Sequence, residues 1–137
     1  CGNGALAIAL ARACPDAEVV AVDISHRAVA CAADNAHRAG LAPPRLTVRV
    51  TDGLADLAAD VLDAVVCNPP FHQDRSVGDA LAWRMFTQAH RALAPGGELR
   101  VVGNRHLDHG RRLTRIFGAC ERLATTGKFE VLAARRR

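Results

Sequence analysis

The sequence predicts an α/β fold built on a doubly wound, mostly parallel sheet. Three observations carry this prediction. Strand-like and helix-like stretches alternate along the whole chain, which is typical of parallel strands joined by crossover helices. Several strand-like stretches are apolar throughout, as expected for strands that are buried on both faces. The chain has 137 residues, half of them hydrophobic, which suits one domain with a substantial core.

Each element is assigned from its hydrophobic period. Short runs that are apolar throughout, or that alternate with period two, are expected as strands. Longer runs with apolar residues three or four apart are expected as helices. In chain order the expected elements are a helix over 5–13, a strand over 19–22, a helix over 26–39, a strand over 46–50, a short helix over 54–59, a strand over 63–67, a helix over 78–94, a strand over 98–102, a helix over 110–117 and an edge hairpin within 120–134.

Local signals set the boundaries of these elements. Pro15 ends the first helix, and Ser25 is a favoured N-cap for the second, which Gly40 ends. The run Pro95-Gly96-Gly97 is expected as a turn before a strand. The domain is expected to cover 1–134, and the arginines at 135–137 are expected as a frayed basic tail.

Composition limits the possible classes of function. The net charge is +4 and the pI about 9.1, which is compatible with a polyanionic partner, although a solvated surface explains it equally simply. The five cysteines are scattered without a closely spaced pair, which favours reduced thiols in the cytoplasm and no metal site. No apolar run reaches membrane length, and no signal peptide is expected.

A glycine loop and two strand-end aspartates suggest a nucleoside site. Gly2 and Gly4 precede a helix, whose first N–H groups point toward a polar or anionic ligand. Asp23 follows a strand about twenty residues later, where such folds bind ribose hydroxyls. This pattern fits NAD and S-adenosylmethionine equally. Asp52-Gly53 follows the next strand and could accept from an adenine amine, although Asp-Gly is also a common turn.

The strongest signal is Asn68-Pro69-Pro70-Phe71, which directly follows the apolar strand expected over 63–67. Two consecutive prolines can continue neither a strand nor a helix, so the backbone is rigid where the strand ends. The Asn68 side-chain oxygen and the Pro69 carbonyl could accept the two hydrogens of an aromatic amine, and Phe71 could stack on its ring. The pattern therefore favours group transfer to a planar amine. The alternative is a rigid turn followed by a core phenylalanine.

These motifs together carry a family resemblance. Cys1-Gly2-Asn3-Gly4, Val22-Asp23-Ile24-Ser25, Thr51-Asp52-Gly53 and the run from Cys67 to Gln73 resemble class I S-adenosylmethionine-dependent methyltransferases. More narrowly, they resemble the bacterial ribosomal RNA guanine-N2 methyltransferases of the RsmC/RlmG type. The stretches 82–86 and 103–108 are more similar to the large-subunit (23S) branch than to the small-subunit (16S) branch.

The resemblance assigns roles to individual residues. Cofactor contacts are implied for Gly2, Asn3, Gly4, Asp23, Ile24, Asp52, Gly53 and Asn68, and the segment Asn68, Pro69, Pro70 and Phe71 would receive the guanine amine. His72 and Gln73 could contact the base edge or cap the next turn. Arg75, Arg84, Arg105 and His106 could meet phosphates or remain solvated.

The resemblance also implies a larger protein. It would contain two methyltransferase-like domains, of which this chain is the second and catalytic one without its first strand, in a seven-stranded sheet whose last strand is antiparallel. The expected partner is rRNA in the cytoplasm, 23S before 16S, with S-adenosylmethionine as cofactor and neither metal nor membrane. Three alternatives stay open: an amine methyltransferase for adenine N6 or a glutamine amide, an NAD-dependent oxidoreductase, and a non-catalytic RNA-binding domain.

Overall fold

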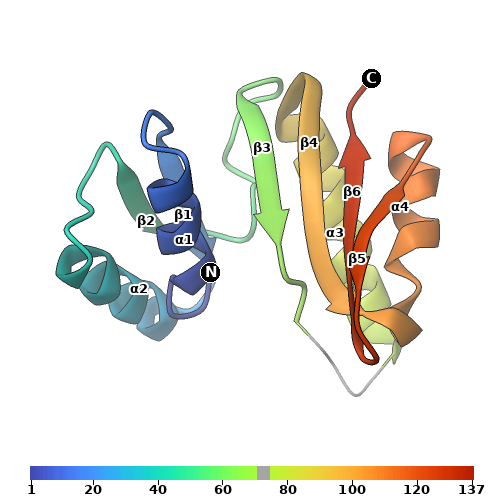
Figure 1. Cartoon of the computed structure of the whole chain (residues 1–137), viewed down its shortest axis with the longest axis horizontal. Helices are drawn as coiled ribbons and strands as arrows, with labels where there is room; N and C mark the ends of the chain where they lie inside the picture. The colour runs from blue at the N-terminus through green and yellow to red at the C-terminus, as the bar shows by residue number, and fades with distance from the viewer. Residues whose placement is uncertain (71–74) are drawn as a thin grey trace. The chain divides into compact units, whose positions relative to one another are not determined.

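A computed structural model describes residues 1–70 and 75–137 of the chain, with side chains described outside 71–77. Helices and strands alternate as the sequence predicts (Figure 1). In order they are α1 (Ala5–Ala13), β1 (Val19–Asp23), α2 (His26–Arg38), β2 (Leu46–Val50), β3 (Leu62–Cys67), α3 (Arg75–Ala92), β4 (Leu93–Asn104), the 3-10 turn η1 (Arg105–Leu107), α4 (His109–Phe117), β5 (Glu121–Thr125) and β6 (Phe129–Arg135). They form two compact units, Cys1–Asp56 and Leu57–Arg137.

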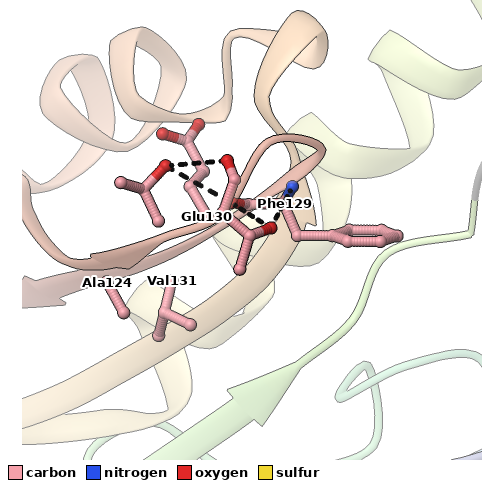
Figure 2. Close-up of a pocket in the computed structure, with 6 residues that line it drawn as sticks. Ala124, Phe129, Glu130 and Val131 are labelled. Carbon is pink, nitrogen blue, oxygen red and sulfur yellow. Dashed lines mark hydrogen bonds between the residues drawn. The ribbon is translucent and has the colours of Figure 1, made fainter.

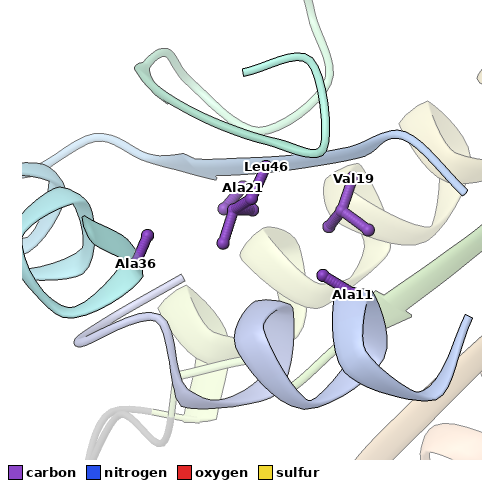
Figure 3. Packing of buried hydrophobic residues seen from close by; sticks show 5 residues of the cluster. All are labelled: Ala11, Val19, Ala21, Ala36 and Leu46. Carbon is purple, nitrogen blue, oxygen red and sulfur yellow. The ribbon is translucent and has the colours of Figure 1, made fainter. Parts of the chain in front are cut away.

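The first unit is a two-stranded parallel sheet with two helices. β1 pairs with β2 in register from Val19 opposite Leu46 to Asp23 opposite Val50. Alanines of α1 and α2 pack against these strands around Val19, Ala21 and Leu46 (Figure 3). The Ala-rich segment Ala5–Ala13 forms the first helix, as the sequence predicts.

One arginine fixes the C-terminal end of α1. The guanidinium of Arg45, just before β2, donates to the carbonyl oxygens of Ala11 at 2.6 Å, Cys14 at 3.3 Å and Ala17 at 2.5 Å. The last carbonyls of a helix have no partner within the helix, and a charged donor satisfies them. Arg45 therefore connects α1 to the start of β2.

The second unit is a four-stranded sheet in the order β3-β4-β6-β5. β3 is parallel to β4, and β6 runs antiparallel to both of its neighbours. Thus the C-terminal hairpin is confirmed, with β5 at the edge. α3 packs against β4 and α4 against β6, on the same face of the sheet (Figure 1). The core between these layers contains Phe86, Leu99, Val101, Leu113 and Leu132.

Two local predictions are wrong. Residues 54–59 form turns and no helix, because Ala55 N–H bonds the Asp52 carbonyl at 3.4 Å and Thr51 Oγ1 bonds Asp56 at 2.9 Å. Pro95-Gly96-Gly97 lies within β4, because the Gly96 N–H donates to the Arg136 carbonyl at 2.8 Å. A bulge in the pairing with β3, between Leu62 and Ala64, accommodates this irregular strand start.

Two of the three C-terminal arginines, expected as a frayed tail, are held by contacts within the second unit. Arg135 belongs to β6, and its guanidinium contacts Glu98 at 2.9 Å. Arg136 donates to the carbonyl oxygens of Arg91 and Leu93 and forms an ion pair with Asp60. These contacts tie residues 135 and 136 to the end of α3 and the start of β4.

The single seven-stranded sheet that the resemblance implies remains a prediction. In the described residues β1 pairs only with β2, and β3 only with β4. Within residues 1–70 and 75–137, no helix has the length and apolar character needed to cross a membrane.

Candidate cofactor and substrate site

The carboxylate of Asp23 organises the end of β1. Its Oδ2 accepts from the backbone nitrogen of Cys1 at 2.8 Å and from the Gly2 N–H at 2.9 Å. Its Oδ1 accepts from the Ser25 N–H at 3.0 Å. A carboxylate has about four acceptor positions, so these contacts leave one on Oδ1 among the described residues. That position suits a ligand hydroxyl.

Asp23 stays ionised at neutral pH. Burial raises the pKa of its carboxyl group, but hydrogen bonds from the backbone nitrogen of Cys1 and from the amides of Ser25 and Gly2 outweigh this effect and lower the pKa below its ordinary value. A carboxylate that is both held in place and charged is a strong acceptor for a ribose hydroxyl.

The glycine loop forms the turn into α1. Gly2 and Gly4 both have positive φ, +55° and +83°, and a Cβ on Gly4 would lie 3.1 Å from the Cβ of Ala32. Only glycine combines this backbone conformation with this close contact to α2. Asn3 has a structural role, since its Oδ1 accepts from the Ala5 N–H at 3.2 Å and its carbonyl accepts from Asn35 at 2.9 Å.

The first unit brings its other predicted residues to the same edge. Ile24 follows Asp23 and is 69% exposed, the highest exposed fraction among the exposed large hydrophobic side chains of the described residues. The N–H of Thr51 donates to the Asp23 carbonyl at 3.0 Å, so the ends of β1 and β2 lie together. Asp52 and Gly53 follow directly, Gly53 with a φ of +61°. This edge therefore presents the glycine loop, two carboxylates and an apolar side chain.

The second unit carries the predicted transfer residues at the end of β3. Cys67, the last residue of β3, pairs with Val101. Asn68, which follows Cys67, is exposed, whereas Pro69 is buried. The buried Pro69 anchors the backbone between Asn68 and Pro70. Phe71, His72 and Gln73 lie outside the described residues. Arg75 begins α3, and its side chain lies outside the described part as well.

Cys67 is chemically inert in this position. Burial raises the pKa of its thiol to about 12. A thiolate is the reactive form of cysteine, so Cys67 does not act as a nucleophile at neutral pH.

Two further predicted residues follow β4. Arg105 and His106 lie in η1 and are exposed. β4 is parallel to β3, so η1 extends from the same end of the sheet as Asn68. Arg105 is fixed to the β5–β6 hairpin, because its N–H donates to the Lys128 carbonyl at 3.1 Å and its Nη1 to the Thr126 carbonyl at 3.5 Å.

His109 was given no role by the sequence, yet it supports this end of the sheet. Its side chain is 2% exposed and meets the Phe86 ring edge-on at 5.4 Å. Arg112 Nη1 lies 3.4 Å from its Nδ1. Because arginine can only donate, Nδ1 accepts and the proton is on Nε2, which has no hydrogen-bond partner among the described residues. Burial lowers the pKa of His109, and the Arg112 charge adds to this effect.

Arg112 connects three elements around this histidine. Its guanidinium contacts Asp79 of α3 at 2.5 Å and donates to the carbonyl of Leu107 in η1 at 2.5 Å. It thus ties α4 to the beginning of α3 and to the turn that carries Arg105. No sequence signal marked it, because its partners lie on other elements. Over the described residues, no cluster of three or more His, Cys, Asp or Glu side chains could hold a metal ion.

Comparison with solved structures places this fold in a class. The structure matches that of the Thermus thermophilus 16S rRNA N2 G1207 methyltransferase (RsmC), solved with AdoMet and guanosine, with a TM-score of 0.84 and 31% identity over 99% of this chain and 35% of that one. The fold also matches a ribosomal protein L11 methylase from Lactobacillus delbrueckii subsp. bulgaricus, with a TM-score of 0.77 and 20% identity over 99% of this chain and 67% of that one. The fold is thus that of class I methyltransferases, as the sequence predicts.

Comparison of sequences then gives the family. The methyltransferase small domain model matches residues 1–133, and the chain belongs to that family. It is 54% identical to the ribosomal RNA large subunit methyltransferase G of Pseudomonas fluorescens over 136 residues, which are 99% of this chain and 36% of that protein. The chain therefore spans about a third of the length of the curated relatives it matches.

Proposed function

We propose that this chain is the catalytic domain of a cytoplasmic rRNA methyltransferase that transfers a methyl group from S-adenosylmethionine to the exocyclic N2 amine of a guanine. The observation that carries the proposal is the exposed Asn68 and anchored Pro69 at the end of β3, in a chain whose glycine loop, Asp23 and Asp52 share the end of β1 and β2. Membership of the methyltransferase small domain family supports the reaction class.

The similarity of the relatives supports 23S rRNA as the substrate. The chain is 54% identical to a protein named as a large-subunit rRNA methyltransferase. It is 31% identical to one described as a 16S rRNA N2 methyltransferase in complex with guanosine. Both descriptions concern methylation of rRNA, and the second supports guanine N2 as the acceptor.

The residues at the end of β1 fit the nucleoside part of S-adenosylmethionine. The remaining acceptor position on Asp23 Oδ1 suits a ribose hydroxyl. Exposed Ile24 provides an apolar contact for the adenine, and Asp52 an acceptor for its amine. When bound, S-adenosylmethionine would supply an electrophilic methyl group on a positively charged sulfur.

Asn68 and Pro69 would orient the accepting amine. The N2 lone pair of guanine is delocalised into the ring, so the amine is a weak nucleophile when planar. Acceptance of its two hydrogens by Asn68 Oδ1 and the Pro69 carbonyl would favour a pyramidal nitrogen with a more available lone pair. With S-adenosylmethionine bound, an N–C bond would form as the C–S bond broke, the electron pair would stay on sulfur, and N2 would release a proton to water.

This reaction needs orientation more than a base. Correct positioning of two reactants lowers a barrier by several kcal/mol, up to about 7–11 in favourable cases. Pro69 and Pro70 contribute because their fixed φ angles leave the Pro69 carbonyl few directions in which to point. Cys67, with its thiol pKa near 12, takes no part in the proton transfer.

The test is methyl transfer by the full-length protein from labelled S-adenosylmethionine to protein-free 23S and 16S rRNA, followed by digestion to nucleosides. The proposal predicts label in N2-methylguanosine from 23S rRNA, and its loss in Asn68→Ala. Label in N6-methyladenosine, or in protein alone, would contradict the proposed acceptor.

A further inference from the structure

We propose that the tip of the β5–β6 hairpin, comprising Thr126, Gly127, Lys128 and Phe129, forms with Arg105 an RNA-docking surface for the nucleotides next to the target guanine. This surface is called the hairpin-tip surface below. The inference rests on the proposed function and adds a location and a mode of binding to it. It involves Lys128 and Phe129, for which the sequence analysis predicts no role.

The hairpin tip lies at the end of the sheet that carries Asn68. Phe129 pairs with Asn104, the last residue of β4, and β4 is parallel to β3. Adjacent strands are about 4.8 Å apart and a strand rises about 3.3 Å per residue. Cys67 is level with Leu132 of β6, three residues beyond Phe129, so the start of β6 lies about 14 Å from the end of β3. A single strand whose target base meets Asn68 would therefore have its neighbouring nucleotides within reach of the tip.

The tip is pre-organised by its own hydrogen bonds. Thr126 N–H donates to the Phe129 carbonyl at 2.8 Å, and Phe129 N–H donates to Thr126 Oγ1 at 3.0 Å. Arg105 N–H then fixes the Lys128 carbonyl at 3.1 Å. A rigid surface loses little conformational entropy on binding. The two cationic side chains thus extend from backbone segments that are already held together.

The charge of this surface suits phosphate. Lys128, the only lysine of the chain, and Arg105 are exposed. The nearest acidic residue in sequence, Glu130, is 4% exposed and is paired with Arg122 at 2.8 Å. Asp108, beyond η1, has Arg111 at 3.6 Å. Because these carboxylates have basic partners, they do not cancel the charge of Lys128 and Arg105, and the surface attracts polyanions.

An aromatic ring and a shallow hollow accompany these charges. Phe129 is 41% exposed, and its ring points out from the hairpin (Figure 2). Beside it the side chains of Ala124 and Val131 point to the same side and line an apolar hollow. Proteins that bind single-stranded RNA combine basic groups with aromatic rings on which bases stack. The combination favours single-stranded RNA over a protein partner.

The test compares RNA affinity and turnover in variants of the full-length protein. Lys128→Ala should weaken rRNA binding about 3- to 10-fold and reduce the slope of log Kd against log salt by about 0.7–1, because one phosphate contact is lost. Phe129→Leu should raise KM for RNA about 5-fold or more, and Phe129→Tyr should restore it because stacking is retained. The kcat at saturating RNA and the Kd for S-adenosylmethionine should not change.

Arg135→Ala is the matched control. This substitution also removes one exposed positive charge. Arg135, however, pairs with Glu98 at the opposite end of the same sheet, away from the hairpin tip. Equal RNA affinity and salt slope for Lys128→Ala and the parent, with methylation intact, would overturn the hairpin-tip surface and leave the proposed function standing. Equal losses for Lys128→Ala and Arg135→Ala would overturn it as well. A parent protein that neither binds nor methylates rRNA would refute both proposals.

Discussion

Replacement of Gly103 by alanine tests how tightly the end of β4 packs on α4. A Cβ at this position would lie 2.4 Å from His109 Cδ2 and 3.1 Å from its Nε2. Carbon atoms in normal contact are about 3.5–4.0 Å apart, so the imidazole ring would have to move by about 1 Å or more. The ring cannot easily do so, because it is 2% exposed and faces fully buried Phe86.

The expected cost follows from this geometry. Overpacking of a well-packed core costs about 1–3 kcal/mol. The loss should be concentrated in β4 and α4, where the two residues lie. Hydrogen exchange of the full-length protein, followed on peptides from these two elements, should therefore accelerate about 5- to 150-fold in Gly103→Ala.

A double-mutant cycle shows whether the clash is the cause. His109→Ala removes the ring that obstructs the new Cβ, so Gly103→Ala should cost little in that background, with a coupling energy of about 1 kcal/mol or more. Additive effects of the two substitutions would refute the packing argument. Unchanged exchange in Gly103→Ala alone would refute it more simply.

Three other predictions concern single residues. Folding lowers the pKa of His109 from its ordinary value of 6.5, so below that pH the unfolded state binds more protons than the folded state. The free energy of unfolding should therefore fall as the pH drops through about 6.5, by at most about 1.4 kcal/mol per pH unit. Hydrogen exchange of α4 at pH 7.5 and 5.5 should show this slope in the parent, and a smaller slope in His109→Gln. Arg45→Ala should destabilise α1 by about 1.5–3 kcal/mol, since it removes charged hydrogen bonds to three carbonyls; equal exchange of α1 in the variant and the parent would be inconsistent with that role. Cys67, with a thiol pKa of about 12, should react with iodoacetamide at pH 8 far more slowly than exposed Cys31. Peptide mass spectrometry measures both rates, and equal rates would contradict the raised pKa of the Cys67 thiol.

Much of the fold could be predicted because it depends on local sequence. The apolar period and the boundary signals placed the helix over 5–13 and the strand over 46–50 at their observed limits. Ser25 caps α2 as expected, accepting from the Ala28 N–H at 3.3 Å. Helix periodicity and capping involve residues within one or two turns of each other, so a single sequence reveals them.

The errors arose where distant partners decide the structure. Pro95-Gly96-Gly97 has the composition of a turn, but its backbone pairs with Arg136, forty residues further along the chain. Arg136 itself has the appearance of a solvated tail, and only the fold shows the carbonyls of Arg91 and Leu93 that it satisfies. Tertiary contacts override local propensity in both cases.

In the candidate site too, features that depend on local sequence could be predicted, and features that depend on distant contacts could not. Asp23 and Asp52 could be predicted to lie together, because the carboxyl ends of neighbouring parallel strands meet at one edge. His109 could not, because its burial depends on the absence of a side chain at Gly103 and on Phe86 of α3. The proposed RNA-docking role of Lys128 could not be predicted either, because it depends on the position of Lys128 beside Arg105, which only the fold shows.

The most direct test of the central claim is a comparison of Asp23→Asn and Asn68→Ala in the full-length protein, with Asp34→Asn on α2 as the charge-matched control. The Kd for S-adenosylmethionine is measured by calorimetry, and single-turnover methylation of 23S rRNA is measured at saturating cofactor. We expect Asp23→Asn to weaken cofactor binding about 10- to 100-fold, since charged hydrogen bonds are lost. We expect Asn68→Ala to abolish transfer while cofactor affinity stays within a few-fold of the parent. Transfer at the parent rate by Asn68→Ala, or unchanged cofactor affinity in Asp23→Asn, would contradict it.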